Sequence, residues 1–156
     1  MRRLFFSILA GFGATSVHLA LMALKRNAGV LPEFDPYEDL QRLLSAATAG
    51  SFQPPSWLLA YLNGALILGF VFGRIFPYLP GRSALARGAA FGFAAWLCLG
   101  LGLLPLAGRG IFGIDLNLGV SPAALMLAMV MIYAITMSLL YGWLMTESAE
   151  NEKGPA

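Results

Sequence analysis

Residues 4–24 read LFFSILAGFGATSVHLALMAL, an apolar run of 21 residues with Arg2-Arg3 before it and Lys25-Arg26 after it. A helix of about 20 apolar residues is long enough to cross the hydrocarbon core of a bilayer. A cleaved secretory signal has a shorter apolar region followed by a small-residue cleavage site. We therefore interpret this segment as an uncleaved first transmembrane helix.

Three further apolar runs predict spans at about 57–76, 88–104 and 122–145, the third of these four spans being stopped by Pro105. The composition agrees, because 58% of the residues are hydrophobic and 12% are charged, about half the charged share of soluble domains. Backbone polar groups in lipid must be satisfied within the segment. The predicted fold is an all-α polytopic membrane protein, a four-transmembrane-helix bundle over residues 1–146, followed by a disordered polar tail at 147–156.

The first long connection carries a predicted helix of its own, at about 36–48. Asp35 is a suitable N-cap, Pro36 suits the first helical position, and Glu38 completes a capping-box arrangement. Apolar residues recur at spacings of three and four, so one face is apolar and should lie on the membrane surface or cap the bundle. The acidic residues here fit a capped helix start better than a cation site, because no EF-hand spacing is present.

Lysine and arginine near the span ends indicate the orientation. With the N-terminus inside, six basic residues lie on the inner side and four on the outer side, which favours both termini in the cytoplasm. High Ala, Gly and Arg usage is typical of a GC-rich bacterial source, so we expect the bacterial inner (cytoplasmic) membrane. The inner set is Arg2, Arg3, Arg74, Arg82, Arg87 and Lys153, and the outer set is Lys25, Arg26, Arg42 and Arg109.

Glycines are dense in the predicted spans. Gly69 and Gly73 form one GxxxG pair, Gly88 and Gly92 form another, and Gly11 lies in a cluster of small residues. Small residues let helix backbones approach closely in lipid. We assign these glycines to helix packing, either within one chain or on a face used by a homo-oligomer or a larger complex.

His18 is the only histidine, and it lies inside the first predicted span. An ionisable residue in a span is a functional candidate. Asn63 lies at nearly the same depth in the second span, Thr15 shares the helix face of His18, and Tyr133 lies within a turn or two. One interpretation is a small polar site for a proton, a quinone or a haem edge. The other is a neutral histidine hydrogen-bonded to Asn63, Thr15 or Ser16.

Signatures of common catalytic centres are missing from the sequence. It has no nucleophile elbow, no HExxH, no phosphate-binding glycine loop and no carboxylate inside a predicted span. One cysteine, Cys98, and one histidine exclude a cysteine-based metal cluster and a bis-histidine haem within one chain. We therefore predict no catalytic residue, no metal and no cofactor. The net charge of +2 gives no reason to expect nucleic acid as a partner.

Short segments spread along the chain share the pattern of a known family. They are GFGAT at 11–15, LPEFD at 31–35, YLPGRS at 78–83, PLAG at 105–108 with Gly110, Phe112 and Gly113, and Tyr141-Gly142. Together they resemble an uncharacterised family of small bacterial four-span inner-membrane proteins, a domain of unknown function. The resemblance implies the same architecture and brings no established activity.

Packing residues throughout, with no catalytic groups, favour a non-enzymatic accessory or structural subunit, or a scaffold of a membrane complex. Its partners would be the lipid bilayer and other membrane-protein subunits or a second copy of the chain. The alternative is a small homo-oligomeric transporter or channel with a polar site at His18 and Asn63. A redox or lipid-modifying enzyme at the outer interface has the least support.

Overall fold

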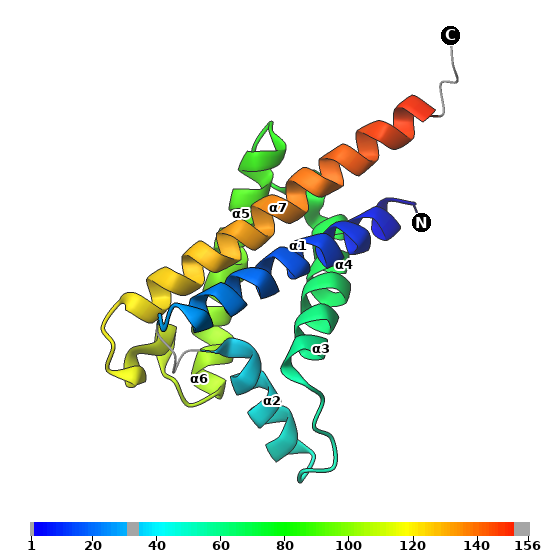
Figure 1. Cartoon of the computed structure of the whole chain (residues 1–156). Helices are drawn as coiled ribbons and strands as arrows, with labels where there is room; N and C mark the ends of the chain where they lie inside the picture. The colour runs from blue at the N-terminus through cyan, green and yellow to red at the C-terminus, as the bar shows by residue number, and fades with distance from the viewer. Residues whose placement is uncertain (1, 31–34, 152–156) are drawn as a thin grey trace.

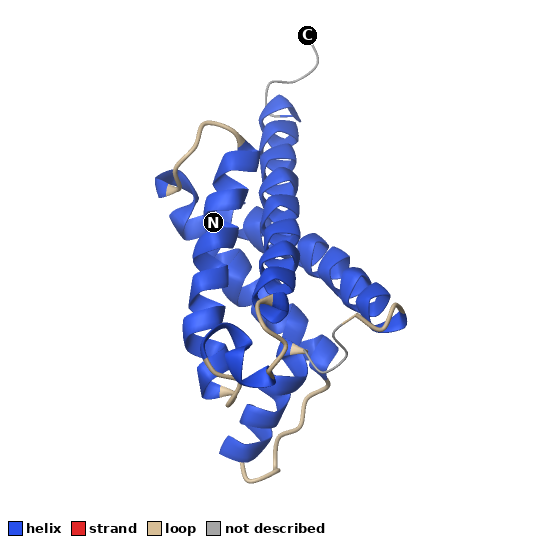
Figure 2. Ribbon diagram, turned by 90° about the vertical axis from the view of Figure 1, so that its left-hand side faces the viewer, coloured by secondary structure: helices blue, strands red, loops and turns tan. Residues whose placement is uncertain are grey.

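The computed structural model describes residues 2–30 and 35–151, and within them the regular structure is helical, with no strand (Figure 2). Four helical segments are long and apolar enough to cross a membrane. They are α1 (Arg2–Asn27), a second long helix (Ser56–Tyr78), a third long helix (Ala84–Leu106) and α7 (Ser121–Asn151). The predicted all-α fold with four candidate membrane spans is confirmed at this level.

The second and third long helices each contain a π-helical stretch. The second consists of α3 (Ser56–Tyr61), π-helical η1 (Leu62–Leu68), α4 (Gly69–Ile75) and a closing 3₁₀ turn, η2 (Phe76–Tyr78). The third consists of α5 (Ala84–Cys98), π-helical η3 (Leu99–Leu103) and α6 (Leu104–Leu106). π-helical turns inside α-helices occur often at functional sites.

Pro105 does not stop the third helix as the sequence suggested. The helix continues to Leu106, and η3 lies directly before the proline. A proline ring clashes with the carbonyl four residues earlier in a regular α-helix. The wider π-helical turn gives that carbonyl room, so the helix passes the proline instead of ending there.

α7 also extends beyond its predicted span. It begins at Ser121 and ends at Asn151, so residues 147–151, which we had assigned to the polar tail, are helical. No proline lies between Pro122 and Pro155 to interrupt the helix. The rest of the predicted tail, 152–156, lies outside the described residues.

The helices are arranged around the pair formed by α1 and α7, which lie side by side (Figure 1). α7 also packs against α5, and α1 also packs against η1 and α4. The order around the bundle is therefore second, first, fourth and third long helix. The start of α1 and the end of α7 lie at one end, which we call the terminal end, and α2 (Pro36–Ala47) lies at the other (Figure 1).

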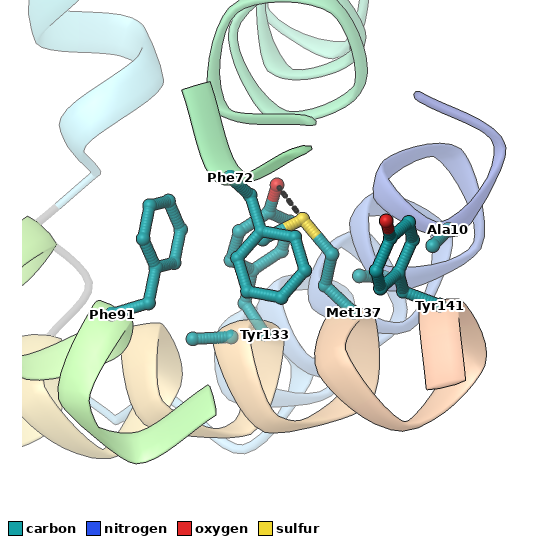
Figure 3. Close-up of a cluster of buried hydrophobic side chains, with 8 residues drawn as sticks. Ala10, Phe72, Phe91, Tyr133, Met137 and Tyr141 are labelled. Carbon is teal, nitrogen blue, oxygen red and sulfur yellow. Dashed lines mark hydrogen bonds between the residues drawn. The ribbon is translucent and has the colours of Figure 1, made fainter. Parts of the chain in front are cut away.

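An aromatic cluster fills the bundle toward the terminal end. Phe72 is fully buried between Phe91 and Tyr141, with ring centroids 5.1 Å and 5.7 Å away (Figure 3). Phe72 comes from the second long helix and Phe91 from the third. This contact joins two helices that the arrangement otherwise separates.

The five glycines assigned to packing lie at helix contacts within the chain. A Cβ on Gly11 would lie 3.0 Å from the carbonyl oxygen of Gly64. One on Gly88 would lie 2.9 Å from the Cα of Ile135. Helix backbones therefore touch where these glycines stand. Of the other three, Gly69 and Gly73 face Ser7 on α1, and Gly92 faces Met131 and Ala134 on α7.

Candidate functional site

A cavity of about 400 Å³ lies inside the bundle, between the second and third long helices and beside α2. A volume in this range is typical of small-molecule sites. Its lining is mostly apolar. The residues come from α1, α2, α7 and the second and third long helices. Among the apolar lining residues are Leu68, Val71, Phe91, Leu99, Met126 and Val130.

The cavity opens on the side of the bundle. Of its lining residues, Val71 is 38% exposed, and Ala94 and Cys98 are also exposed. These three residues form the rim, with Val71 on the second long helix and the other two on the third. The rings of Phe72 and Phe91 meet between the same two helices, with centroids 5.1 Å apart, and Phe91 lines the cavity. The opening therefore faces sideways, between two apolar helices.

The polar lining residues gather at the α2 end of the cavity. His18 comes from α1, Tyr37 from α2, Asn63 from η1 and Tyr133 from α7. The His18 ring meets Tyr37 and Tyr133 edge-on, with centroid separations of 5.8 Å and 6.2 Å. The structure thus brings together three of the four residues of the predicted polar site. The fourth, Thr15, is buried and does not line the cavity.

Tyr37 also belongs to this cluster, although it is not one of the residues of the predicted polar site. Its side chain lies beside that of Asn63, and both line the cavity. Burial raises the pKa of the Tyr37 phenol, so the hydroxyl keeps its proton at neutral pH. Its place on the apolar face of the 36–48 helix was visible in the sequence. What could not be read there is that α2 turns this face toward α1 and η1.

Two of the partners expected for a hydrogen-bonded His18, Thr15 and Ser16, bond elsewhere. The hydroxyl of Thr15 donates to the carbonyl of Gly11 at 2.8 Å. The hydroxyl of Ser16 bonds the carbonyl of Phe12 and the hydroxyl of Tyr61, each at 3.0 Å. Neither residue is therefore the partner of the histidine.

The His18 ring lies beside the backbone of Met129, and its Nδ1 is buried without a hydrogen-bond partner. This atom is the only buried side-chain nitrogen or oxygen without a partner among the described residues. Leaving such an atom unpaired costs about 1–3 kcal/mol.

Tyr133 joins α7 to the π-helical stretch η1. Its hydroxyl donates to the carbonyl of Gly64 at 2.6 Å. The hydroxyl also contacts the sulfur of Met137 at 3.5 Å (Figure 3). The same carbonyl accepts the amide of Gly69, five residues further along η1. The π-helical turn therefore offers a carbonyl to a side chain of another helix beside the cavity.

Replacing Tyr133 by Phe removes this bond and leaves the Gly64 carbonyl with its backbone donor. We expect a loss of about 1 kcal/mol in the free energy of unfolding, the usual size for one neutral hydrogen bond. Unfolding of the purified protein in mixed micelles of rising dodecyl sulfate content measures it. Tyr78→Phe is the matched control, because Tyr78 is 86% exposed. Equal unfolding midpoints for the two variants would contradict the assignment.

α2 is anchored at its place by buried carboxylates. Asp35 caps the helix by accepting the amides of Tyr37 and Glu38 at 3.1 Å and 3.3 Å, which confirms the predicted N-cap. Its other oxygen pairs with Arg26 of α1 at 2.7 Å. The acidic residues described in this segment therefore serve the start and the docking of α2.

A second carboxylate, Asp39, pairs with Arg109 at 2.9 Å and with Arg42 at 2.6 Å. Arg109 lies in the connection after α6, so this ion pair joins α2 to the third long helix. Next to it, η4 (Ile111–Leu116) packs on that helix through Phe112, whose ring centroid lies 4.5 Å from that of Trp96. The two connections at this end thus form one layer over the bundle.

The lining of the cavity carries few polar groups. It contains no Asp, Glu, Lys or Arg, and its polar side chains are one imidazole, two phenols, one amide and the thiol of Cys98. No group of three or more His, Cys, Asp or Glu that could hold a metal ion occurs in residues 2–30 and 35–151. The site can therefore enclose an apolar molecule and form a few neutral hydrogen bonds with one end of it.

Comparison with known proteins places the chain at the level of a family. A family model described as "Family of unknown function (DUF6789)" matches residues 1–152. This confirms the resemblance to a family of unknown function. No curated protein and no solved structure matches the chain.

Proposed function

We propose that the chain, which belongs to the DUF6789 family of unknown function, is an integral membrane protein that binds an amphipathic, lipid-like molecule. The single observation that carries this proposal is the cavity, apolar along its length, polar at one end and open at its side. The role is non-enzymatic and accessory, in keeping with the expectation from the sequence. The bound molecule would be presented to, or stored for, other components of the membrane.

The surroundings of the opening support a ligand that arrives from the bilayer. The long helices expose large apolar side chains around their outer surface, among them Phe12, Phe70, Phe93 and Leu139. Such a surface is suited to lipid contact. With the four long helices across the bilayer, the rim at Val71, Ala94 and Cys98 would face acyl chains. An apolar molecule could then enter without crossing water.

We further propose the orientation and location expected from the sequence, with α2 outside, both termini in the cytoplasm, and the bacterial inner membrane as the site. Transport is the second candidate function. It is favoured by a cavity that reaches from a lateral opening to the layer at the α2 end. In that case His18 and Asn63 would mark the polar end of the path. The packing glycines give no support to an oligomer, because they face helices of their own chain.

A rim substitution tests the proposed function. In Ala94→Phe a bulky ring stands in the opening of the cavity. Overpacking of a site costs about 1–3 kcal/mol, here taken from the binding of the ligand. We therefore expect about tenfold less co-purifying apolar molecule per chain. The measurement is solvent extraction and mass spectrometry of protein purified in mild detergent and washed free of loosely held lipid. Ala128→Phe is the matched control, because Ala128 is exposed on α7 and away from the cavity.

The outcomes are distinct. A species retained by the wild type and by Ala128→Phe, and lost from Ala94→Phe, supports a ligand in the cavity. The same lipid content in all three proteins would mean that the retained lipid lies elsewhere, and the proposal would fail. Circular dichroism and the gel-filtration profile of each variant establish that its fold is intact.

A further inference from the structure

We infer that the polar head of the bound molecule is uncharged and carries a hydrogen-bond donor, a hydroxyl group, which is held by Nδ1 of His18. The ligand class is therefore a long-chain or polycyclic alcohol. This inference rests on the proposed function and adds the chemistry of the head group to it.

The hydrogen bonding of His18 fixes the sense of the interaction. A neutral imidazole carries one N–H and one lone pair, and the buried Nδ1 has no acceptor beside it for a proton. We therefore place the proton on the other nitrogen, Nε2, which is not among the buried atoms without a partner. A neutral ring that donates from one nitrogen carries a lone pair on the other. The unpartnered Nδ1 is then an acceptor, and it lacks a donor.

The neighbouring polar groups do not share this lack of a partner. The hydroxyl of Tyr133 donates to the carbonyl of Gly64. No side-chain nitrogen or oxygen of Tyr37 or Asn63 is among the buried atoms without a partner. Among the described residues, Nδ1 of His18 is thus the one buried side-chain polar atom that would gain a first partner from a ligand.

The charge of the lining excludes an ionic head. None of the lining residues is a carboxylate, a lysine or an arginine. The buried carboxylates at α2, Asp35 and Asp39, are paired with Arg26 and Arg109. A phosphate, carboxylate or ammonium head would be buried without a counter-charge, at a cost far above that of a neutral hydroxyl. A hydroxyl satisfies the acceptor and adds no charge.

Two ligands with the same dodecyl chain, one with a hydroxyl donor and one with a methyl group in place of that hydrogen, test this inference. The protein is placed in phosphatidylcholine nanodiscs, and displacement of radiolabelled 1-dodecanol is measured with unlabelled 1-dodecanol and with dodecyl methyl ether. Empty nanodiscs give the correction for partitioning into lipid. We expect the alcohol to bind the wild type about 5- to 10-fold more tightly than the ether, the effect of one neutral hydrogen bond.

Variants identify the acceptor. In His18→Phe the ratio of the two affinities should fall to about one, with ether binding kept within about twofold of the wild type. Thr15→Val is the matched control, because it removes a buried hydroxyl of the same helix that bonds within α1, and it should keep the preference. His18→Gln retains an acceptor oxygen at this position, so it should keep part of the preference for the alcohol over the ether.

The results separate the two proposals. Displacement by both ligands with equal strength in the wild type would overturn the head-group inference and leave the proposed function standing. Displacement by neither would contradict both. Should His18→Phe fail to fold, the wild-type ratio decides the head group and His18→Gln decides the acceptor. Shielding of the single cysteine, Cys98, from N-ethylmaleimide by bound dodecanol establishes that the molecule occupies the cavity, since this thiol lies on its rim.

Discussion

Gly88→Leu should destabilise the bundle by about 3 kcal/mol or more. A Cβ at this position would lie 2.9 Å from both the Cα of Ile135 and the Cβ of Ser138, and 3.0 Å from the carbonyl oxygen of Ala134. Two of these atoms belong to the backbone of α7 and cannot rotate away. α5 and α7 must therefore separate, which places the effect at or above the upper end of the usual cost of overpacking.

The measurement is the free energy of unfolding in mixed micelles. Gly102→Leu is the matched control, since Gly102 lies on the same long helix and a Cβ there would meet nothing within 4 Å. We expect the control to unfold within about 1 kcal/mol of the wild type. Gly88→Ala gives a smaller loss of the same sign if the leucine variant does not accumulate. A Gly88→Leu protein as stable as Gly102→Leu would contradict the close approach of α5 and α7.

The contrast between Gly88 and Gly102 marks what the sequence could and could not predict. Both are glycines of one apolar segment, and their number and spacing suggest close packing for either. Only the position of α7 distinguishes them, because it brings backbone atoms against the first and leaves the second in open space. Which helix a small residue meets is decided by the whole bundle, whereas the existence of each long helix follows from local hydropathy.

The candidate site divides in the same way. His18, Asn63 and Tyr133 could be grouped from the sequence, because their depths follow from counting along the predicted spans. Tyr37 could not, since its approach to the group requires α2 to fold back over the end of the bundle. Nor could the π-helical turn η1, which depends on contacts with α1 and α7 and has no simple signature in composition.

Asp39→Asn should release α2 from the bundle at a cost of about 3 kcal/mol. The carboxylate of Asp39 is 2% exposed. It accepts hydrogen bonds from Nε and Nη2 of Arg109, at 3.1 Å and 2.9 Å. Removing one partner of a buried ion pair costs roughly 3–5 kcal/mol. The lower end applies, because the Arg109 side chain is 21% exposed and Arg42 is 63% exposed, so water can take over part of their solvation.

Hydrogen exchange of the α2 amides measures the release. A loss of about 3 kcal/mol corresponds to roughly 100-fold faster exchange in α2, with α7 unchanged. Glu38→Gln is the matched control, because it removes the same charge from an exposed side chain 3.6 Å from Arg26, and it should leave exchange nearly unaltered. Equal exchange in the two variants would show that the Asp39 pair does not anchor α2.

The same variant connects the anchor to the cavity. Tyr37 and Leu40 are lining residues carried by α2, so a released helix withdraws part of the cavity lining. Dodecanol should then dissociate faster from Asp39→Asn than from Glu38→Gln, although neither carboxylate lines the cavity. Faster dissociation with unchanged alcohol preference would separate the two parts of the site, with retention depending on α2 and head-group choice on His18. Unchanged dissociation together with fast α2 exchange would mean that the rim and the long helices hold the molecule without α2.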